Sequence, residues 1–445
     1  MSKKKVQKFY LVKGFKDILP EDQLYWEFVR AKFFNVAKSY GYDRIDLPIL
    51  EDSKLFVKGV GNLTDVVSKE MFTFETLGNE KVSLRPEGTA GTVRAYIEHG
   101  MVNRKKPVKM FYIGPMFRYD KPQAGRYRQF YQFGLEVFAE DDPIIDSQMI
   151  YMTYQLFDEL KIPVIIKINS IGCPKCREKF LKILKDYLKK NKSKLCKDCQ
   201  IRYNKNILRI LDCKEKKCRE IVLEAPQILD HLCDDCNKHF VKVLEYLEDS
   251  QINYELDPFI VRGLDYYNRT TFEILPTEEF CEGDPGSQSA LAGGGRYDYL
   301  VKNLGGQNTP AIGMAFGMDR IVNALKKVKN LELSNINTSD VFVAQLGDKA
   351  RKKVLILFEK LRRAGFSVAE SISKTSLGQQ LEEANRLKTK LALIVGEKEL
   401  LDKTVLIRDM ESGNQEVVPE NKIESVLELR LKSLDISVKK VRLHN

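Results

Sequence analysis

The stretch YIGPMFRYDKPQAGRYRQFYQFGLEVFA, residues 112–139, decides the fold prediction. Two runs with strand character flank the cation-rich loop KPQAGRYR. In the second run, side-chain alternation places Gln132, Gly134 and Glu136 on one face and apolar residues on the other. Arg118 ends the first run, where its guanidinium can fork onto a phosphate. A hairpin with an ordinary charged tip is the alternative. However, a Gln and a Glu on the same face of the strand, beside an Arg, favour a polar, concave face.

Two more segments carry polar groups that could bind a substrate. In LRPEGTA, residues 84–90, the Glu87 carboxylate and the Thr89 hydroxyl flank Gly88, a pair that suits an ammonium or imidazolium because these offer only donors. A turn followed by a helix is the alternative. In IVRGLDYYNRTTFEI, residues 260–274, an Arg, an Asp and two Tyr crowd a short apolar segment, where an unpaired charge would be costly.

Glycines mark the next two segments. ALAGGGRYDYLV, residues 290–301, contains three consecutive glycines, which let a backbone approach a ligand closely. PAIGMAFGMDRIV, residues 310–322, predicts a strand, Gly317, and a helix with Arg320 in its first turn. A cation at a helix N-terminus opposes the helix dipole, so Arg320 is expected to have an anionic partner.

Together these segments indicate phosphate binding by several separate arginines on a strand scaffold. The sequence contains no GxxxxGK followed by Ser or Thr, which excludes the usual phosphate-binding loop. It contains neither HIGH nor KMSKS, so a Rossmann-type aminoacyl-tRNA synthetase is not expected either.

These segments resemble motif two, the two histidine-specific motifs and motif three of class II histidyl-tRNA synthetases. GYDRIDLPILE, residues 41–51, resembles motif one at the family's dimer interface through Pro48, and VKGFKDILP near the N-terminus also fits. RGLDYY and GGGRYD are specific to this family, whereas the three general motifs mark only the class. Asp319 stands where motif three usually has Glu, and we assign it no role.

The resemblance implies roles for individual residues. Arg118 and Arg320 would clamp the phosphates of ATP, and Arg262 would reach the histidine carboxylate and the α-phosphate together, so Arg118 and Arg262 are the expected catalytic residues. Glu87 and Tyr267 would bind the imidazole ring. Thr89, Gln132 and Glu136 would hold the α-amino group, and Arg126 would meet the acceptor end of the tRNA. The complete set expected to bind histidine is Glu87, Gly88, Thr89, Gln132, Glu136, Arg262, Tyr266 and Tyr267.

The resemblance and the residue patterns also predict the domain organisation. An α+β catalytic domain with an antiparallel sheet of the class II type is expected over residues 1–330, with a helical, cysteine-rich insertion over 170–250. The polar residues 331–338 are expected to form a linker. Residues 339–433 alternate strand and helix patterns and predict an α/β anticodon-binding domain, and a tail covers 434–445.

Eight of the nine cysteines fall in the expected insertion. CxxC spacing suits a knuckle around one tetrahedral zinc ion, and small modules often need a metal to fold. The alternative is a set of reduced thiols in a helical insertion. We predict structural zinc here without assigning which pairs share an ion. The candidate ligands are Cys173, Cys176, Cys196, Cys199, Cys213, Cys218, Cys233 and Cys236.

Composition sets the remaining expectations. The 445 residues carry a formal charge of +11, which favours a polyanionic partner over a merely solvated basic surface. A signal peptide and a run of about 18 apolar residues are both absent, so no membrane association is expected.

The resemblance completes the functional prediction. It implies a cytoplasmic homodimer that joins L-histidine to tRNA(His) with ATP and Mg²⁺. The alternative is the non-catalytic, synthetase-like regulatory subunit of ATP phosphoribosyltransferase in histidine biosynthesis. Such proteins generally lack the anticodon domain and parts of the histidine motifs, all of which are present here.

Overall fold

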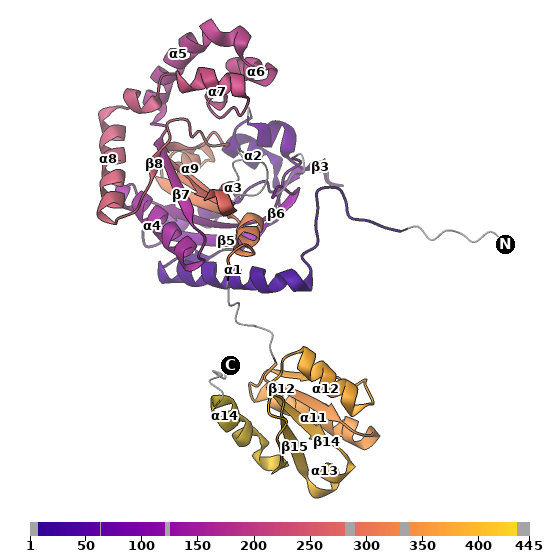
Figure 1. Cartoon of the computed structure of the whole chain (residues 1–445). Helices are drawn as coiled ribbons and strands as arrows, with labels where there is room; N and C mark the ends of the chain where they lie inside the picture. The colour runs from indigo at the N-terminus through magenta and orange to yellow at the C-terminus, as the bar shows by residue number, and fades with distance from the viewer. Residues whose placement is uncertain (1–7, 63, 121–124, 281–289, 330–338, 434–445) are drawn as a thin grey trace, which may run out of the picture. The chain divides into compact units, whose positions relative to one another are not determined.

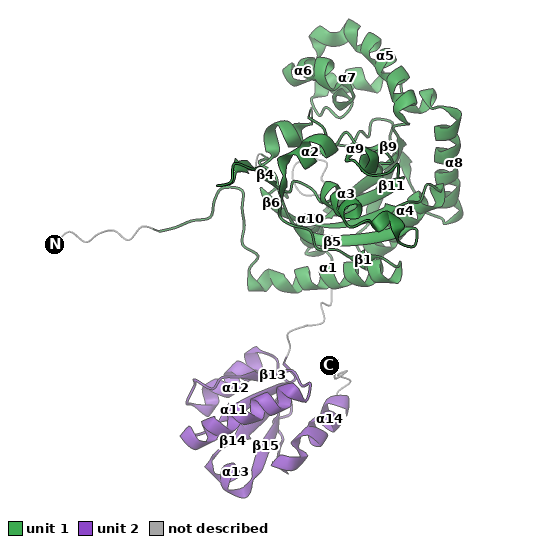
Figure 2. Ribbon diagram, turned by 180° about the vertical axis from the view of Figure 1, so that it is seen from behind, with its two compact units in different colours: residues 1–332 green, residues 333–445 purple. Residues whose placement is uncertain are grey.

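The structure is a computed structural model that describes residues 8–62, 64–120, 125–280, 290–329 and 339–433. The chain forms two compact units, residues 1–332 and 333–445 (Figure 2). The predicted linker and tail, part of the KPQAGRYR loop and Cys281 lie outside the described residues. Among the described helices, none has the length and apolar character needed to cross a bilayer.

An eight-stranded sheet forms the centre of the first unit. Neighbouring strands are antiparallel except at the two edges, where β1 with β5 and β7 with β8 pair in parallel. The predicted antiparallel sheet is confirmed. The order is β1 (Asp43–Arg44), β5 (Val108–Phe117), β6 (Gln129–Phe138), β11 (Ala311–Gly317), β10 (Ala292–Arg296), β9 (Asn268–Pro276), β7 (Val164–Ser170) and β8 (Glu255–Leu256).

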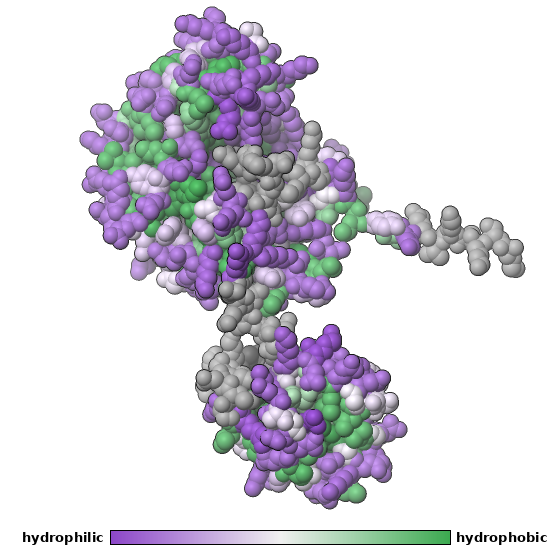
Figure 3. All heavy atoms as spheres, in the orientation of Figure 1, coloured by the Kyte–Doolittle hydropathy of each residue, from purple (hydrophilic) through white to green (hydrophobic). Residues whose placement is uncertain are grey.

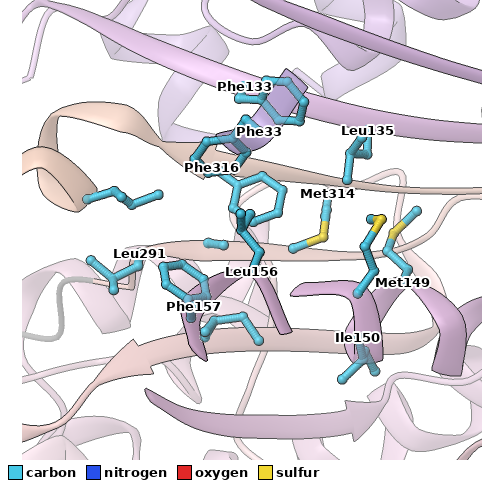
Figure 4. Close-up of a cluster of buried hydrophobic side chains, with 14 of the residues drawn as sticks. Phe33, Phe133, Leu135, Met149, Ile150, Leu156, Phe157, Leu291, Met314 and Phe316 are labelled. Atoms are coloured by element: carbon cyan, nitrogen blue, oxygen red, sulfur yellow. The ribbon is translucent and has the colours of Figure 1, made fainter. Parts of the chain in front are cut away.

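Helices α1 (Pro20–Ser39), α4 (Pro143–Glu159) and α10 (Met318–Leu325) bury one face of this sheet. Apolar residues at helical spacing turn one side of α1 to the core, where the Phe33 ring lies 4.7 Å from that of Phe133. Figure 4 shows the side chains of β6 and β11 pointing toward those of α4 across this core. The polar face of the same strands is left for the site.

Shorter elements surround that polar face. Helices α2 (Ser53–Val60), α3 (Thr89–Glu98) and α9 (Leu300–Asn303) pack together, next to a small sheet of β2 (Leu50–Asp52), β4 (Lys81–Leu84) and β3 (Thr73–Glu75). Pro48 is exposed between β1 and β2, in keeping with a residue that cannot donate to a strand ladder.

A helical module interrupts the sheet between β7 and β8. It consists of α5 (Pro174–Asn191), α6 (Lys197–Lys205), α7 (Lys216–Leu223) and α8 (Asp234–Asp249) (Figure 1). The last helix packs against α4, where the Ser147 hydroxyl donates to the Val243 carbonyl at 3.1 Å. In the view of Figure 3, hydrophilic residues predominate over α5 to α7. The chain enters and leaves the module beside the sheet.

The second unit contains a mixed five-stranded sheet. Its order is β13 (Val368–Glu370), β12 (Val341–Gln345), β14 (Leu391–Val395), β15 (Thr404–Asp409) and β16 (Gln415–Pro419), with the first three strands parallel. Helices α11 (Asp348–Arg363), α13 (Glu397–Asp402) and α14 (Ile423–Ser433) contribute to the larger core, and α12 (Leu377–Arg386) covers the other face. The predicted α/β fold is confirmed.

Candidate active site

A pocket of ≈ 610 Å³ opens on the polar face of the large sheet. Most of the residues predicted to bind substrates line it, although they come from segments far apart in the chain. The exceptions are Gly88 and Glu136, which lie behind the wall. The predicted residues that line the pocket are Glu87, Thr89, Arg118, Arg126, Gln132, Arg262, Tyr266, Tyr267 and Arg320.

Glu87 is held at the start of α3. Its two carboxylate oxygens accept hydrogen bonds from the backbone N–H groups of Thr89 at 2.6 Å and Ala90 at 2.8 Å. These donors have no partner within the helix, so the carboxylate completes the helix start. Burial raises the pKa of Glu87, and the two backbone hydrogen bonds oppose that rise.

Glu136 lies behind Thr89 and not at the pocket surface. The Thr89 hydroxyl donates to Glu136 Oε1 at 2.7 Å, and the Tyr297 hydroxyl donates to Oε2. Burial raises the pKa of Glu136 to about 8, against the hydrogen bonds from Tyr297 and Thr89. Since its hydroxyl proton is engaged with Glu136, Thr89 offers the pocket an acceptor.

The ring of Tyr112 fills the space beside Gly88 and Gly134. A Cβ on either glycine would come within 2.2 Å of that ring. The sequence suggests that Gly134 leaves room in a concave face, but a protein side chain occupies the space nearest to it. Tyr112 itself lines the pocket and was not predicted.

Gln132 and the tyrosine pair form the adjoining wall. Gln132 Oε1 is buried and has no hydrogen-bond partner among the described residues. Such an acceptor is costly unless a donor arrives, and an ammonium can supply one. The rings of Tyr266 and Tyr267 lie 4.6 Å apart, and both hydroxyls have pKa values raised by burial.

Arg262 enters the pocket from the loop before β9. Its Nη1 donates to Glu273 Oε1 at 2.6 Å, and its guanidinium lies 5.5 Å from the Tyr267 ring. A Cβ on Gly293 would lie 2.5 Å from Arg262 Nη1, so this glycine makes room for the arginine.

Two of the three glycines of β10 serve the packing of neighbouring strands and do not face the pocket. A Cβ on Gly294 would meet the Gly313 carbonyl at 2.3 Å, and one on Gly295 would meet the Thr270 carbonyl at 2.5 Å. The close approach of neighbouring strands therefore explains these two glycines. Gly293 alone of the three faces the pocket.

The remaining arginines are anchored by carbonyl groups or by a carboxylate. Arg118 Nε donates to the Pro86 carbonyl at 2.9 Å, next to Glu87. Arg320 donates to the carbonyls of Gly125 at 3.2 Å and Ala290 at 2.8 Å. Arg126 donates to Asp120 at 3.0 Å. These contacts hold three guanidinium groups in the pocket lining.

Asp319 also lines the pocket, but its carboxylate is engaged. It accepts from the Tyr131 N–H at 2.8 Å and pairs with Lys16 Nζ at 2.7 Å. Lys16 belongs to the N-terminal segment VKGFKDILP. Asp319 therefore ties that segment to the pocket wall.

Residues of the helical module complete the pocket, and none of them was predicted to bind substrate. Arg202 and Arg209 approach Asp65 at 3.3 and 3.4 Å, and Asn206 donates to Asp265 at 3.0 Å. Their positions depend on how the module folds back, which no local pattern reveals. The cations of α6, such as Arg202, were the only signal in the sequence that could have pointed to them. The eight module cysteines form two groups that could hold a metal, Cys173, Cys176, Cys233 and Cys236, and Cys196, Cys199, Cys213 and Cys218.

Comparison with known proteins gives a consistent result. The family model described as "Histidyl-tRNA synthetase" matches residues 14–321, and the one described as "Anticodon binding domain" matches residues 340–430. The curated histidine–tRNA ligase of Thermosipho melanesiensis is 47% identical over 91% of this chain and 94% of its own length. That of Dehalococcoides mccartyi is 44% identical over 92% and 96%.

Solved structures agree with these relatives. The crystal structure of apo histidyl-tRNA synthetase from S. aureus has a TM-score of 0.78 at 30% identity, and covers 95% of this chain and 100% of its own. A structure from Bacillus halodurans described as an ATP phosphoribosyltransferase regulatory subunit/histidyl-tRNA synthetase has a TM-score of 0.60 at 18% identity, over 88% of this chain and 99% of its own. At that identity it shows the fold alone.

Proposed function

The chain belongs to the histidyl-tRNA synthetase family, and we propose how the residues of its pocket divide that family's reaction among them. The protein is a histidine–tRNA ligase: it activates L-histidine with ATP to histidyl-adenylate and transfers the histidyl group to tRNA, releasing diphosphate and AMP. The observation that carries the proposal is one pocket lined by Glu87, Gln132 and three tyrosines together with Arg118, Arg262 and Arg320.

We assign the α-ammonium of histidine to Glu87, Thr89 and Gln132. An ammonium offers three donors, and this wall supplies a carboxylate, a hydroxyl oxygen and the unpartnered Gln132 Oε1. Arg118 donates to the carbonyl of Pro86, next to Glu87, and its charge opposes the rise that burial causes in the pKa of Glu87. The ammonium is attached to the same carbon as the reacting carboxylate and belongs near the phosphate-binding side.

We assign the imidazole ring to the tyrosine end of the pocket. Tyr112, Tyr266 and Tyr267 line it, with Glu136 behind them bonded to Tyr297. This reverses the sequence-based roles of Glu87 and Glu136, and the reason is position: Glu87 lies beside Arg118, whereas Glu136 is enclosed by tyrosines. A flat ring with one donor and one acceptor nitrogen suits hydroxyl groups better than it suits an arginine-rich wall.

Arg262, Arg118 and Arg320 handle the reacting charges. The histidine carboxylate is already a nucleophile, so positioning and charge stabilisation supply most of the acceleration. Its oxygen attacks the α-phosphorus, the bond to the β-phosphate oxygen breaks, and diphosphate leaves with the electron pair. Arg262, steadied by Glu273, stabilises the charge that develops at the α-phosphate. ATP enters as its magnesium complex, and no residue is assigned to the ion.

The transfer step needs the tRNA acceptor end in the same pocket. A terminal ribose hydroxyl attacks the carbonyl carbon of the adenylate, and AMP departs. Arg126, paired with the neighbouring Asp120 on the loop between β5 and β6, is our candidate for contact with the acceptor end. The second unit matches the anticodon-binding family, and tRNA(His) is the proposed substrate.

The regulatory-subunit alternative is not supported. Curated relatives at 47% and 44% identity over more than nine-tenths of the chain are ligases, and the anticodon-binding unit is present. The likeness to the Bacillus halodurans protein concerns fold only.

We further propose a cytoplasmic homodimer. Ile49, Leu50 and Phe74 expose nearly half of their surfaces on or beside the β2–β4–β3 sheet, next to the segment that resembles motif one. Apolar side chains gathered there favour a second copy as partner. Light scattering of the purified protein should give about twice the mass of 51.3 kDa.

Amino-acid-dependent exchange of diphosphate into ATP tests the proposed function. We expect exchange with L-histidine and none above background with the other amino acids. Exchange without histidine, or equal exchange with a second amino acid, would contradict the proposal. Charging of tRNA(His) against another tRNA then tests the second substrate.

A further inference from the structure

The four CxxC and CxxxxC pairs of the helical module come together two by two. Cys173, Cys176, Cys233 and Cys236 form one group, which we call the root group because its members begin α5 and α8. Cys196, Cys199, Cys213 and Cys218 form the tip group around the starts of α6 and α7. Within each group the four sulfur atoms lie within 4.8 Å of one another.

The root group has the geometry of a knuckle around one ion. Cys173 Sγ lies 3.6 Å from Cys176 Sγ and 3.9 Å from Cys233 Sγ. Four sulfurs at about 2.3 Å from a tetrahedral zinc would be about 3.8 Å apart. The backbone N–H of Cys233 also donates to Cys176 Sγ at 3.1 Å. Such a bond stabilises a thiolate, the form that binds metal.

The tip group repeats this arrangement. Cys196 Sγ lies 3.9 Å from Cys213 Sγ, and the Cys196 N–H donates to Cys218 Sγ at 3.2 Å. The Cys199 N–H donates to Cys196 Sγ at 3.4 Å. Three of the four cysteines in this group are buried.

Disulfide bonds and iron–sulfur clusters fit the two groups less well than single metal ions do. All eight cysteines are free thiols, and the sulfur separations are well beyond the ~2.05 Å of a disulfide. Helices α6 and α7 have nine and eight residues, too few to be stable without strong tertiary support. A tetrahedral set of four sulfurs suits zinc or iron, and an iron–sulfur cluster spreads its thiolates over several metal atoms. One ion fits each group.

We propose that the module binds two structural zinc ions, one in the root group and one in the tip group. The root zinc joins the start of α5, at Cys173, to the start of α8, at Cys233. The tip zinc joins α6 to the segment before α7. Each ion supplies folding free energy to the module, in addition to the burial of apolar residues such as Phe180, Leu184 and Leu188.

The tip zinc also bears on the active-site pocket. Cys196 and Cys213 line that pocket together with Arg202, Arg209 and Asp212. Arg202 and Arg209 pair with Asp65 on the opposite wall. The tip ion therefore positions the arginines that close this side of the pocket. This consequence rests on the proposed function, whereas the presence of zinc does not.

Metal analysis of the untagged protein, purified without chelator, tests the proposal. We expect two zinc ions per chain in the unmodified protein and in Cys281→Ser, which changes the one cysteine outside the module. Cys236→Ser and Cys218→Ser should each retain one, and the double variant none. One zinc or less per unmodified chain, or iron in its place, would overturn the proposal.

Zinc-edge X-ray absorption of the unmodified protein gives a second measurement that needs no variant to fold. We expect four sulfur neighbours per zinc at about 2.3 Å. Two or more nitrogen or oxygen neighbours would overturn the tetrathiolate assignment. Hydrogen exchange then tests which residues depend on the tip zinc, by chelator treatment and by the Cys218→Ser variant. In the Cys218→Ser protein, residues 196–223 and 64–70 should lose protection, while α1 keeps it. Unchanged exchange at residues 64–70 would overturn the link to the pocket, whatever the activity assay shows.

Discussion

At the scale of single residues, the pocket is organised by protein contacts that do not require substrate. Glu87 is fixed by two backbone N–H groups, Arg118 by the Pro86 carbonyl, and Arg262 by Glu273. Groups held in place in advance need little reorganisation when charge develops, which is the main physical source of catalysis in acyl and phosphoryl chemistry. The effects of substitutions should therefore separate binding from turnover.

Replacing Arg262 by Ala should lower the single-turnover rate of histidyl-adenylate formation by roughly 100- to 1000-fold, the usual loss when a donor aimed at developing charge is removed. The matched control is the double variant Arg262→Ala, Glu273→Gln, which removes the carboxylate left without its partner. If unpaired charge were the cause, the double variant would recover activity. We expect no recovery, and a rate within about threefold of the parent in Arg262→Ala would contradict the assigned role.

Replacing Glu87 by Gln should weaken binding of ligands that carry the α-amino group by about 1–3 kcal/mol, because a buried charge partner is removed. Histidinol retains that group and imidazolepropionate lacks it. Calorimetry should show weaker binding of histidinol by the variant and nearly unchanged binding of imidazolepropionate and ATP. Equal losses for both imidazole ligands would indicate that Glu87 binds the imidazole ring or that the start of α3 is damaged. Either result would contradict the assignment of Glu87 to the α-ammonium.

The sequence could identify most of these residues, but it could not place all of them correctly. Gln132 and Glu136 share a strand face as alternation requires, yet only Gln132 reaches the pocket. The difference depends on Tyr297, which is 161 residues further along the chain and holds Glu136 back. Tyr112 could have been inferred from its position opposite Gly134, since a missing side chain often accommodates a large neighbour.

At the scale of elements, one buried ion pair connects parts of the fold that lie far apart in sequence. Arg296 on β10 is fully buried and donates to both oxygens of Asp146 on α4, while His239 of α8 contacts the same carboxylate at 3.3 Å. The guanidinium also donates to the carbonyls of Glu140 and Asp142. The arginine of GGGRYD therefore supports the scaffold and does not line the pocket.

Replacing Asp146 by Asn should destabilise the first unit by about 3–5 kcal/mol, because it leaves the Arg296 charge buried without its partner. Urea unfolding monitored by the fluorescence of Trp26, the one tryptophan and a core residue of this unit, measures the loss. The control is Asp298→Asn, whose carboxylate lies 3.5 Å from Arg296 and is less buried. A similar loss in both variants would contradict the importance given to the Asp146 pair.

Elements with a clear period were predictable, and pairings between distant elements were not. The alternation over residues 339–433 indicated the strands and helices of the second unit. The cysteine pairs were equally clear as pairs. Which pairs share a site depends on the path of α5 to α8. In the structure, the first pair meets the last, and the two inner pairs meet each other.

At the scale of the whole molecule, each of the two units has its own hydrophobic core. The apolar clusters of unit 1 contain no described residue beyond 328, and those of unit 2 begin at Val341. All described residues that line the pocket belong to unit 1. The units should therefore make separable contributions to amino-acid activation and to tRNA binding.

Removing residues 339–445 should leave histidine-dependent diphosphate exchange within about threefold of the full chain and reduce tRNA charging far more. Unit 2 carries cations along α11, although Lys353, Lys360 and Arg362 already pair with carboxylates of the same unit. For each tRNA phosphate that unit 2 no longer neutralises, the slope of log affinity against log salt should fall by about 0.7–0.9. Binding of tRNA(His) at several salt concentrations measures that slope. The matched variant is Arg126→Ala in the full chain, which should reduce the slope only by the contribution of its contact with the acceptor end. The truncated chain could still have the mass of a dimer, charge tRNA fully and show an unchanged slope. That result would show that no contact between unit 2 and the anticodon arm matters for the reaction.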